Sequence, residues 1–409
     1  MMFQKKLLVA AVAGALGAGA TGAAFAQTTV GNVQIYGRLY PEFTVGKSSG
    51  ATPAGASSST LGRAPTGLNH ESRNSVDASN SRLGFRGTEN LGGGLSALWQ
   101  IETAIAIDQG TGTLASRDSF VGLKGGFGTV KLGNMETVYK SLGDPLGILG
   151  ISSGNFVSLS NVTSSRTAFG TSSAGSFHLR QKNSVNYQSP SFGGFTLHAA
   201  YSPDEIRSGN NLNADLSSFG LEYKRGPIEA SIAHEIHNDF FAGSFGVGSS
   251  SPVANPTTGA TGVHSKDKGT RGTVLYEYSP GGKLQLNYAT VKFEESGGAA
   301  GKFKDYSNDR WSLTWEHRWN TQWRTAVGYA NANSGSCSLA GGVACTTNGL
   351  GANMLTLGAD YSFSRRTALF LLYAKLNNKS ASQQRNAENW TPDPGADITQ
   401  YAIGIRHNY

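Results

Sequence analysis

Apolar and polar residues alternate along most of the chain. In residues 310–319 the odd positions carry Trp, Leu, Trp, His and Trp, whereas the even positions carry Arg, Ser, Thr, Glu and Arg. Because successive side chains of a strand point to opposite faces, this pattern predicts a strand with one apolar and one polar face. In a soluble protein the apolar face would contact the core. In a membrane barrel it faces lipid, and the charged face lines a wet lumen.

The pattern recurs in pairs of strands, with a tight turn inside each pair and a long polar loop between pairs. This order is typical of outer-membrane barrels, which have short periplasmic turns and long external loops. A soluble sandwich would also alternate, but it would not keep turns and loops in such strict order. We therefore predict an all-β protein, a transmembrane antiparallel β-barrel of about 16 strands. The predicted strands are Val33–Phe43, Ser81–Gly87, Leu95–Ile107, Arg117–Lys124, Thr129–Val138, Lys182–Gln188, Phe195–Ser202, Ser218–Lys224, Ile228–His237, Arg271–Tyr278, Lys283–Phe293, Arg310–Trp319, Trp323–Asn331, Ala352–Phe363, Thr367–Leu376 and Asp397–Tyr409.

The stretch from Tyr139 to Phe177 lacks this alternation, yet it is too apolar for a polar linker. Loops this long without strands are uncommon in compact folds and are usually functional or disordered. The apolar side chains favour order, because their burial offsets part of the ordering entropy. We expect the segment to fold into the barrel and narrow its lumen. Its apolar residues are Leu142, Leu146, Ile148, Leu149, Ile151, Phe156, Val157, Leu159, Val162, Phe169 and Phe177.

Two other stretches, Gly46–Ser79 and Asn238–Gly269, predict long external loops. The first is rich in Ser, Thr, Gly and Pro, so we expect it to be exposed. One predicted strand is ambiguous, because Ala368–Ala374 is apolar on both faces and its alternation does not say which face is inward.

The first 26 residues predict a secretory signal peptide. Lysines at positions 5 and 6 precede an apolar run over residues 7–20, and Ala-Phe-Ala at 24–26 offers a cleavage site. A membrane anchor would need a longer and more apolar run. Cleavage after Ala26 leaves residues 27–409 as the barrel. The formal charge then falls from +7 to +5, since the two lysines are the only charged residues removed.

Composition narrows the function classes further. The mature chain is mildly basic without clusters of Lys and Arg, so no nucleic-acid partner is predicted. No mature segment approaches the roughly 20 apolar residues of a transmembrane helix. In an exported chain, Cys337 and Cys345 predict one disulfide that closes a short loop. We find no grouping of Ser, His and acid that indicates an enzyme, and no cofactor is implied.

Several motifs carry a family resemblance. They are Ile-Tyr-Gly-Arg at 35–38, Ser-Arg-Leu-Gly-Phe-Arg-Gly at 81–87, Phe-Val-Gly-Leu at 120–123 with Gly-Phe-Gly-Thr-Val at 126–130, Asn-Ser-Val-Asn-Tyr-Gln-Ser-Pro at 183–190, and Gly-Ile-Arg-His at 404–407. Together they resemble the general trimeric porins of Gram-negative bacteria, most of all the β-proteobacterial branch. The resemblance covers the chain from about Val33 to Tyr409, where Tyr stands in place of the usual terminal Phe. It implies a homotrimer of water-filled barrels in outer-membrane lipid, each with its third external loop folded inward.

The resemblance also implies a constriction in which an acidic loop patch faces basic wall residues. Arg38 and Arg82 match wall positions of that basic cluster. From their strand phase, we expect Arg117, Lys131 and Arg180 to face the lumen as well.

Two departures weaken this expectation. The family usually has Arg after Lys-Leu-Gly at 131–133, where this chain has Asn134. Asp144 is the only carboxylate between Tyr139 and Arg180. We therefore expect Glu42 and Glu102 to contribute from the wall, and an excess of base to give a weak anion preference.

The sequence thus predicts an outer-membrane pore for passive diffusion of small hydrophilic solutes and ions. Two alternatives stay open. One is a substrate-specific channel for a particular anion or small acid, which a saturable current would indicate. The other is a closed structural or adhesive barrel that acts through its external loops, which the polar lumen face argues against.

Overall fold

The structure is a computed structural model of the chain, and it describes residues 33–56, 59–78, 80–144, 146–149, 156–164, 177–203, 214–240, 262–386 and 391–409. The predicted signal peptide and its cleavage site after Ala26 lie outside these residues, as do Ile151 and Phe169 of the apolar segment.

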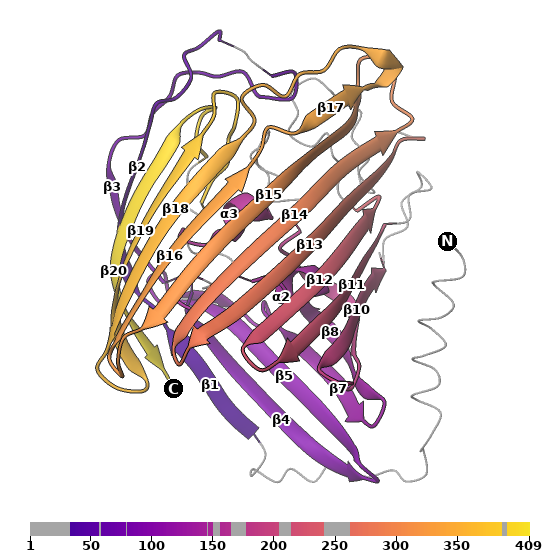
Figure 1. Cartoon of the computed structure of the whole chain (residues 1–409), viewed down its shortest axis with the longest axis vertical. Helices are drawn as coiled ribbons and strands as arrows, with labels where there is room; N and C mark the ends of the chain where they lie inside the picture. Colours follow the sequence, from indigo (N-terminus) through magenta and orange to yellow (C-terminus); the bar gives the residue numbers. More distant parts are fainter. Residues whose placement is uncertain are drawn as a thin grey trace.

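The described residues form 20 strands in one antiparallel sheet (Figure 1). The strands are β1 (Val33–Leu39), β2 (Glu42–Ser49), β3 (Arg73–Asp77), β4 (Arg82–Gly92), β5 (Leu95–Ala106), β6 (Thr111–Thr113), β7 (Ser119–Gly125), β8 (Gly128–Glu136), β9 (Arg180–Gln188), β10 (Phe195–Pro203), β11 (Asp215–Arg225), β12 (Ile228–Asn238), β13 (His264–Ser279), β14 (Gly282–Ser296), β15 (Phe303–Arg318), β16 (Trp323–Ala332), β17 (Ser336–Leu339), β18 (Ala352–Ser362), β19 (Thr367–Asn378) and β20 (Asp397–Asn408). The sheet closes into a barrel because β20 pairs with both β1 and β2.

Four barrel strands are each broken into two pieces that share a neighbour. The pairs β1–β2, β3–β4, β6–β7 and β16–β17 continue one another along β20, β1–β2, β5 and β15 respectively. Merging these four pairs leaves 16 barrel strands among the 20, which confirms the predicted fold class. The break between β1 and β2 falls at Tyr40-Pro41, where proline has no N–H for the sheet ladder.

Some boundaries were predicted wrongly. The expected exposed loop Gly46–Ser79 is shorter, because β2 continues to Ser49 and β3 begins at Arg73. Strand β13 begins at His264, inside the predicted loop Asn238–Gly269. Polar residues dominate both regions, so composition alone could not separate a loop from a strand that rises beyond the bilayer.

The outer face is apolar and the inner face polar, as the alternation predicts. Trp311 is 38% exposed on the outer face of β15, whereas its neighbour Arg310 is fully buried on the inner face. Aromatic side chains such as Tyr278, Trp319 and Trp323 are exposed near the short turns, as in an interfacial girdle. Among the described residues, no helix is both long and apolar enough to cross a bilayer.

The apolar segment after β8 lies inside the barrel. Its two short helices, α2 (Val138–Ser141) and α3 (Ser160–Thr163), are seen within the ring of strands (Figure 1). A Cβ on Gly220 of β11 would meet Val138 and Leu142, and a Cβ on Gly328 of β16 would meet Leu149 and Leu159. Glycine on these strands therefore lets the segment approach the wall closely. We call the described residues of 137–179 the inner loop.

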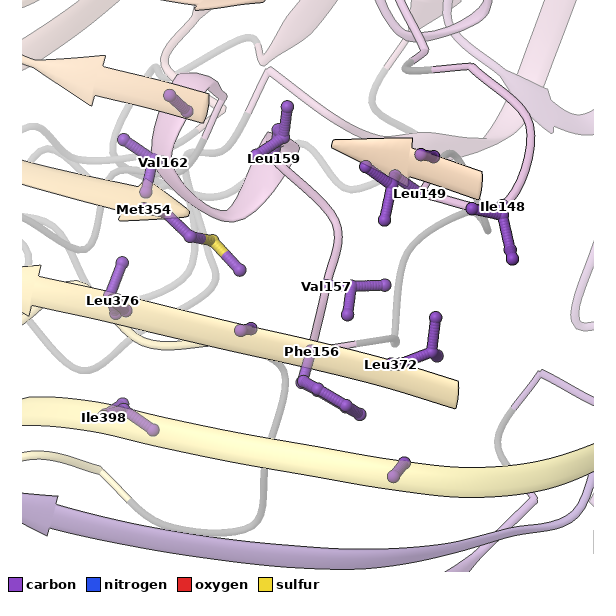
Figure 2. Close-up of a cluster of buried hydrophobic side chains, with 14 of the residues drawn as sticks. Ile148, Leu149, Phe156, Val157, Leu159, Val162, Met354, Leu372, Leu376 and Ile398 are labelled. Carbon is purple, nitrogen blue, oxygen red and sulfur yellow. The ribbon is translucent and has the colours of Figure 1, made fainter. Parts of the chain in front are cut away.

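The inner loop is fixed to the wall by an apolar cluster. Figure 2 shows Leu149, Val157 and Leu159 beside strand residues such as Met354 and Leu372. A polar contact also holds the inner loop, since the backbone N–H of Ile148 donates to Glu316 Oε2 at 2.8 Å. The structure also decides which face of β19 is inward, which the sequence left open. The inward residues of β19 are buried, and they are Ala368, Phe370, Leu372 and Ala374.

A second apolar cluster joins the external loops. Leu61, in the region predicted to be exposed, is fully buried against Leu339, Leu350 and Ala381. The structure joins Cys337 to Cys345 in a disulfide, and both residues pack against this cluster beside the short helix η3 (Ala340–Gly342).

Candidate pore constriction

A polar cavity of about 340 Å³ lies between the inner loop and the wall formed by the first strands. Six of the eight predicted pore residues line it, and Asp144 comes from the inner loop. They are Arg38, Arg82, Glu102, Arg117, Asp144 and Arg180, and Gln100, Asp118, Glu136 and Gly147 complete the lining.

Irregular backbone places these side chains. Arg38 precedes the break between β1 and β2, and Arg82 is the first residue of β4 after the break that follows β3. Arg117 and Asp118 lie in the gap between β6 and β7. Strands β8 and β9 shift register between Gly133 and Met135. Bulges and breaks of this kind re-aim side chains and often occur next to functional sites.

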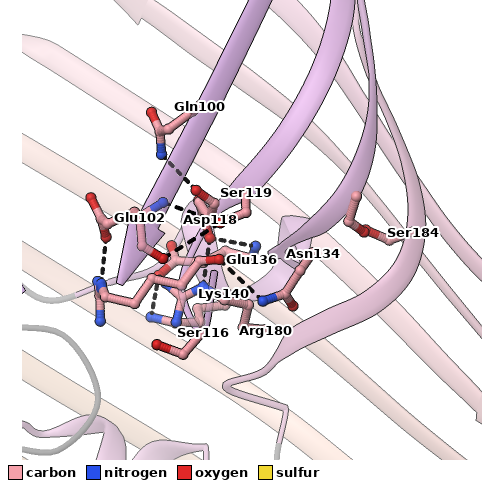
Figure 3. A network of polar contacts seen from close by, with 12 residues as sticks. Gln100, Glu102, Ser116, Asp118, Ser119, Asn134, Glu136, Lys140, Arg180 and Ser184 are labelled. Atoms are coloured by element: carbon pink, nitrogen blue, oxygen red, sulfur yellow. Dashed lines mark hydrogen bonds and ion pairs between the residues drawn. The ribbon is translucent and has the colours of Figure 1, made fainter. Parts of the chain in front are cut away.

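Three cations of the site, Arg117, Arg180 and Lys140, are held in ion pairs. Arg117 pairs with Glu102. Arg180 contacts Asp118 at 2.5 Å through Nε and Glu136 at 2.6 Å through Nη2, as Figure 3 shows. These pairs fix the wall carboxylates and cancel most of their field.

Lys140 of α2 ties the inner loop to this network. Its ammonium lies 3.0 Å from Glu136 Oε1 and 3.1 Å from Asp144 Oδ2. It also lies 3.0 Å from Nε2 of His178, whose Nδ1 is 3.3 Å from Asp144 Oδ1. Burial, together with the charges of Lys140 and two arginines, holds the pKa of His178 well below its usual range, so the imidazole is neutral.

Arg38 and Arg82 differ from the other cations. Within the described ranges, neither has a carboxylate within ion-pair distance. Arg38 donates through Nε to the backbone oxygen of Asn80 at 3.2 Å, and its guanidinium lies 5.2 Å from the centre of the Tyr40 ring. The site therefore carries one excess positive charge. Arg38, Arg82, Arg117, Arg180 and Lys140 face Glu102, Asp118, Glu136 and Asp144.

Comparison with known proteins identifies the family. The model of the Gram-negative porins matches residues 9–381. The chain belongs to this family. It is 27% identical over 334 residues to the major outer membrane protein P.IB of Neisseria lactamica, a match that covers 80% of this chain and 83% of that one. The resemblance drawn from the sequence motifs is thus confirmed.

Solved structures share the fold of this porin. An anion-selective porin from Comamonas acidovorans matches with a TM-score of 0.67 and 23% identity, covering 92% of this chain and 99% of that one. The trimer form of OmpT from Vibrio cholerae matches with a TM-score of 0.59 and 15% identity, again over 92% and 99%. Membership of the porin family makes the barrel an outer-membrane pore, and the inner loop packs against the inner face of its wall.

Two predicted pore residues of this porin lie elsewhere. Lys131 faces the lumen but lines a neighbouring cavity, with its ammonium 4.5 Å from the centre of the Phe120 ring. Glu42 is buried on β2 and does not line the constriction cavity.

Sequence reasoning missed Asp118, Glu136 and Lys140. The lumen phase set by Lys131 would place residue 136 on the outer face, but the register shift after Gly133 turns Glu136 inward. Asp118 lies in an irregular gap where strand phase does not apply. The acidic half of the constriction therefore comes mainly from the wall.

Asn134 takes a structural part at the position where an Arg was expected. Its side-chain amide donates to the backbone oxygens of Ala115 and Arg117 at 3.2 and 3.1 Å. The amide thus holds the irregular segment that presents Arg117 to the cavity, and it adds no charge.

Proposed function

We propose that this porin conducts small hydrophilic solutes and ions by passive diffusion, with a weak preference for anions. The observation that carries the proposal is the pair Arg38 and Arg82, two fixed cations without ion-pair partners among the described residues, in the cavity between inner loop and wall. Fixed charge beside a narrow aqueous path raises the local concentration of counter-ions. The preference is weak because the other cations are neutralised by carboxylates. The anion-selective porin with the same fold supports this sign.

We further propose that the porin works as a homotrimer in outer-membrane lipid and that its signal peptide is removed after Ala26. The trimer form of a structural relative supports the assembly. Amino-terminal sequencing of the protein from outer membranes should begin at Gln27. We assign the protein no catalytic role.

Single-channel recording in a planar bilayer under a salt gradient tests the proposal. We expect conductance steps in groups of three and a reversal potential of anionic sign. The preference should shrink in concentrated salt, because the screening length falls to about 3 Å at 1 M. A cationic sign would overturn the role given to Arg38 and Arg82. Absence of current from folded protein would overturn the pore itself.

A further inference from the structure

A second cavity of about 340 Å³ lies along the inner faces of β1, β4, β5 and β7. It is on the periplasmic side of the constriction, because β4 and β5 run from the constriction toward their short turn. Gln100 lines both this cavity and the constriction cavity, so the two spaces adjoin at that residue. We call the second space the exit cavity. A solute that leaves the constriction toward the periplasm meets it.

The exit cavity is built on one row of neighbouring side chains. Gln34 of β1 pairs with Arg86 of β4. Gln100 of β5 lies between Arg86 and Phe120 of β7, as the register partner of both. Neighbouring strands are about 4.8 Å apart, so the backbones of Arg86 and Phe120 are about 10 Å apart across the sheet. Both side chains line the cavity, and one small molecule can therefore contact both.

Arg86 presents a fixed cation to the exit cavity. Its guanidinium lies 4.7 Å from the centre of the Tyr36 ring, and its Nε donates to Gln34 Oε1 at 2.9 Å. Among the described residues, no carboxylate lies within ion-pair distance of Arg86, and its two Nη groups make no hydrogen bond. Paired N–H groups of a guanidinium fit the two oxygens of a carboxylate. No described residue that lines the exit cavity is acidic, so nothing there competes with such an anion.

Two inward apolar side chains, Leu98 and Phe120, lie beside this cation. On the other side of the barrel, inward apolar residues such as Phe370 and Leu372 are buried under the inner loop. Leu98 and Phe120 are only half-buried, and they line a cavity instead. Gly122, the register partner of Leu98, has no side chain to separate them. An apolar ring in contact with this pair would remove its surface from water.

We propose that the exit cavity is a transient binding site for small aromatic carboxylates, of which benzoate is the simplest. The Nη groups of Arg86 bind the carboxylate, and Leu98 and Phe120 contact the ring. The other cation near Phe120, Lys131, lines a different cavity. The site deepens the proposed passive transport of anions and rests on it, because the pore supplies the ligand. It concerns the residence of one class of anion and not the sign of ion selectivity.

Current noise caused by added solute tests this site. Benzoate, acetate and benzamide are added in turn to the periplasmic side of channels in a planar bilayer, and the noise gives the affinity of each probe. Acetate lacks the ring, and benzamide lacks the charge. We expect benzoate to bind about 5-fold more tightly than either, since a 5-fold change corresponds to about 1 kcal/mol.

Substitutions at Arg86 separate a binding site from a general field. Arg86→Lys keeps the charge but loses the planar pair of donors, so benzoate should bind about 3-fold more weakly. Arg86→Gln loses both and should weaken benzoate about 10-fold, which corresponds to about 1.4 kcal/mol. Lys124→Gln is the matched control, because Lys124 is an exposed cation on the same strand as Phe120 and lies outside the exit cavity. It should leave the affinity for benzoate unchanged.

A substitution at Leu98 tests the apolar part of the site. Leu98→Ser removes apolar surface and leaves the charge of the cavity unchanged. Benzoate should bind about 3-fold more weakly, and the affinity for acetate should not change, because acetate has no ring to contact Leu98. Equal losses for benzoate and acetate would overturn the contact with the ring.

Equal affinity for the three probes, or equal effects of Arg86→Gln and Lys124→Gln, would overturn the site while the pore stands. A larger loss with Lys131→Gln than with Arg86→Gln would overturn the assignment to Arg86. Chloride conductance without added solute is recorded for every variant and reports on the proposed transport separately. Saturation-transfer NMR of the detergent-solubilised porin with benzoate reads the site without any current. Transfer that Arg86→Gln abolishes and Lys124→Gln retains supports the site, and equal transfer to wild type and Arg86→Gln overturns it.

Discussion

The two sides of the lumen carry opposite chemistry although they belong to one sheet. On the side of β1 to β9, charged residues face the open constriction cavity. On the side of β16 to β20, inward residues such as Phe370 and Leu372 are apolar and buried under the inner loop. The outer face shows no such division, because the bilayer selects apolar side chains all around.

This difference shows what sets the inner face of a barrel. Inward residues under the apolar part of the inner loop are apolar, whereas those that line the constriction cavity are charged. The inner loop therefore does two things at once. It covers an apolar wall, and it presents Asp144 to the charged wall across the cavity.

Disrupting the apolar contacts that hold the inner loop against β16 to β20 should have the largest effect on the pore. Leu149→Asp places a carboxylate among fully buried side chains next to Gly328 and Gly358. Loss of the leucine alone should cost about 2–5 kcal/mol, and the unpaired charge adds to this. We expect the inner loop to leave the wall, with higher single-channel conductance and new proteolytic cleavage within residues 137–179.

The matched control is Leu68→Asp, which adds the same charge at an exposed external position. It should leave conductance and cleavage as in the wild type. Wild-type conductance and protease resistance in Leu149→Asp would mean that these apolar contacts do not hold the inner loop.

Charge substitution on the open side should have the next largest effect. The double variant Arg38→Gln with Arg82→Gln removes the two cations that lack ion pairs among the described residues. The charge of the site then changes from one excess cation to one excess carboxylate. The reversal potential in a dilute salt gradient should change from anionic to cationic sign. Retention of the anionic sign would place the selective field elsewhere in the lumen.

The strand order, the signs of the two faces and the inward location of the apolar segment all followed from the sequence, because they depend on alternation and on local composition. The contacts of the constriction did not follow. Glu136 and Asp118 reach the cavity through a register shift and a strand break, which the two-residue period does not describe. The burial of Leu61 also could not be predicted, because it depends on Leu339 and Ala381 from loops distant in the chain.

A single-charge comparison sharpens the difference between paired and unpaired arginines. Arg180→Gln leaves Asp118 and Glu136 without their common partner, whereas Arg82→Gln breaks no ion pair among the described residues. Hydrogen bonds to charged groups contribute about 1.5–3 kcal/mol. Arg180→Gln should therefore lower the temperature at which the barrel unfolds in detergent, measured by gel mobility, and Arg82→Gln should not. Equal unfolding temperatures would show that the pairs contribute nothing to stability.

The smallest expected effect is a pH dependence of the inner loop. Neutral His178 accepts a hydrogen bond from Lys140 at Nε2, so protonation there would set two cations against each other. Burial and the neighbouring cations hold its pKa well below the usual value. A detached loop would restore that value of about 6.5. The docked state thus binds fewer protons, and its stability should be constant above pH 6.5 and fall below it.

The slope is at most about 1.4 kcal/mol per pH unit. We expect brief steps to higher conductance to become more frequent as the pH falls from about 7.5 to 5.5, a range that spans the ordinary histidine pKa. The informative quantity is the difference between wild type and His178→Gln. The variant has no imidazole to protonate, and the frequency of its steps to higher conductance should change less over this range. Identical pH profiles would remove His178 from the coupling between the inner loop and the charged wall.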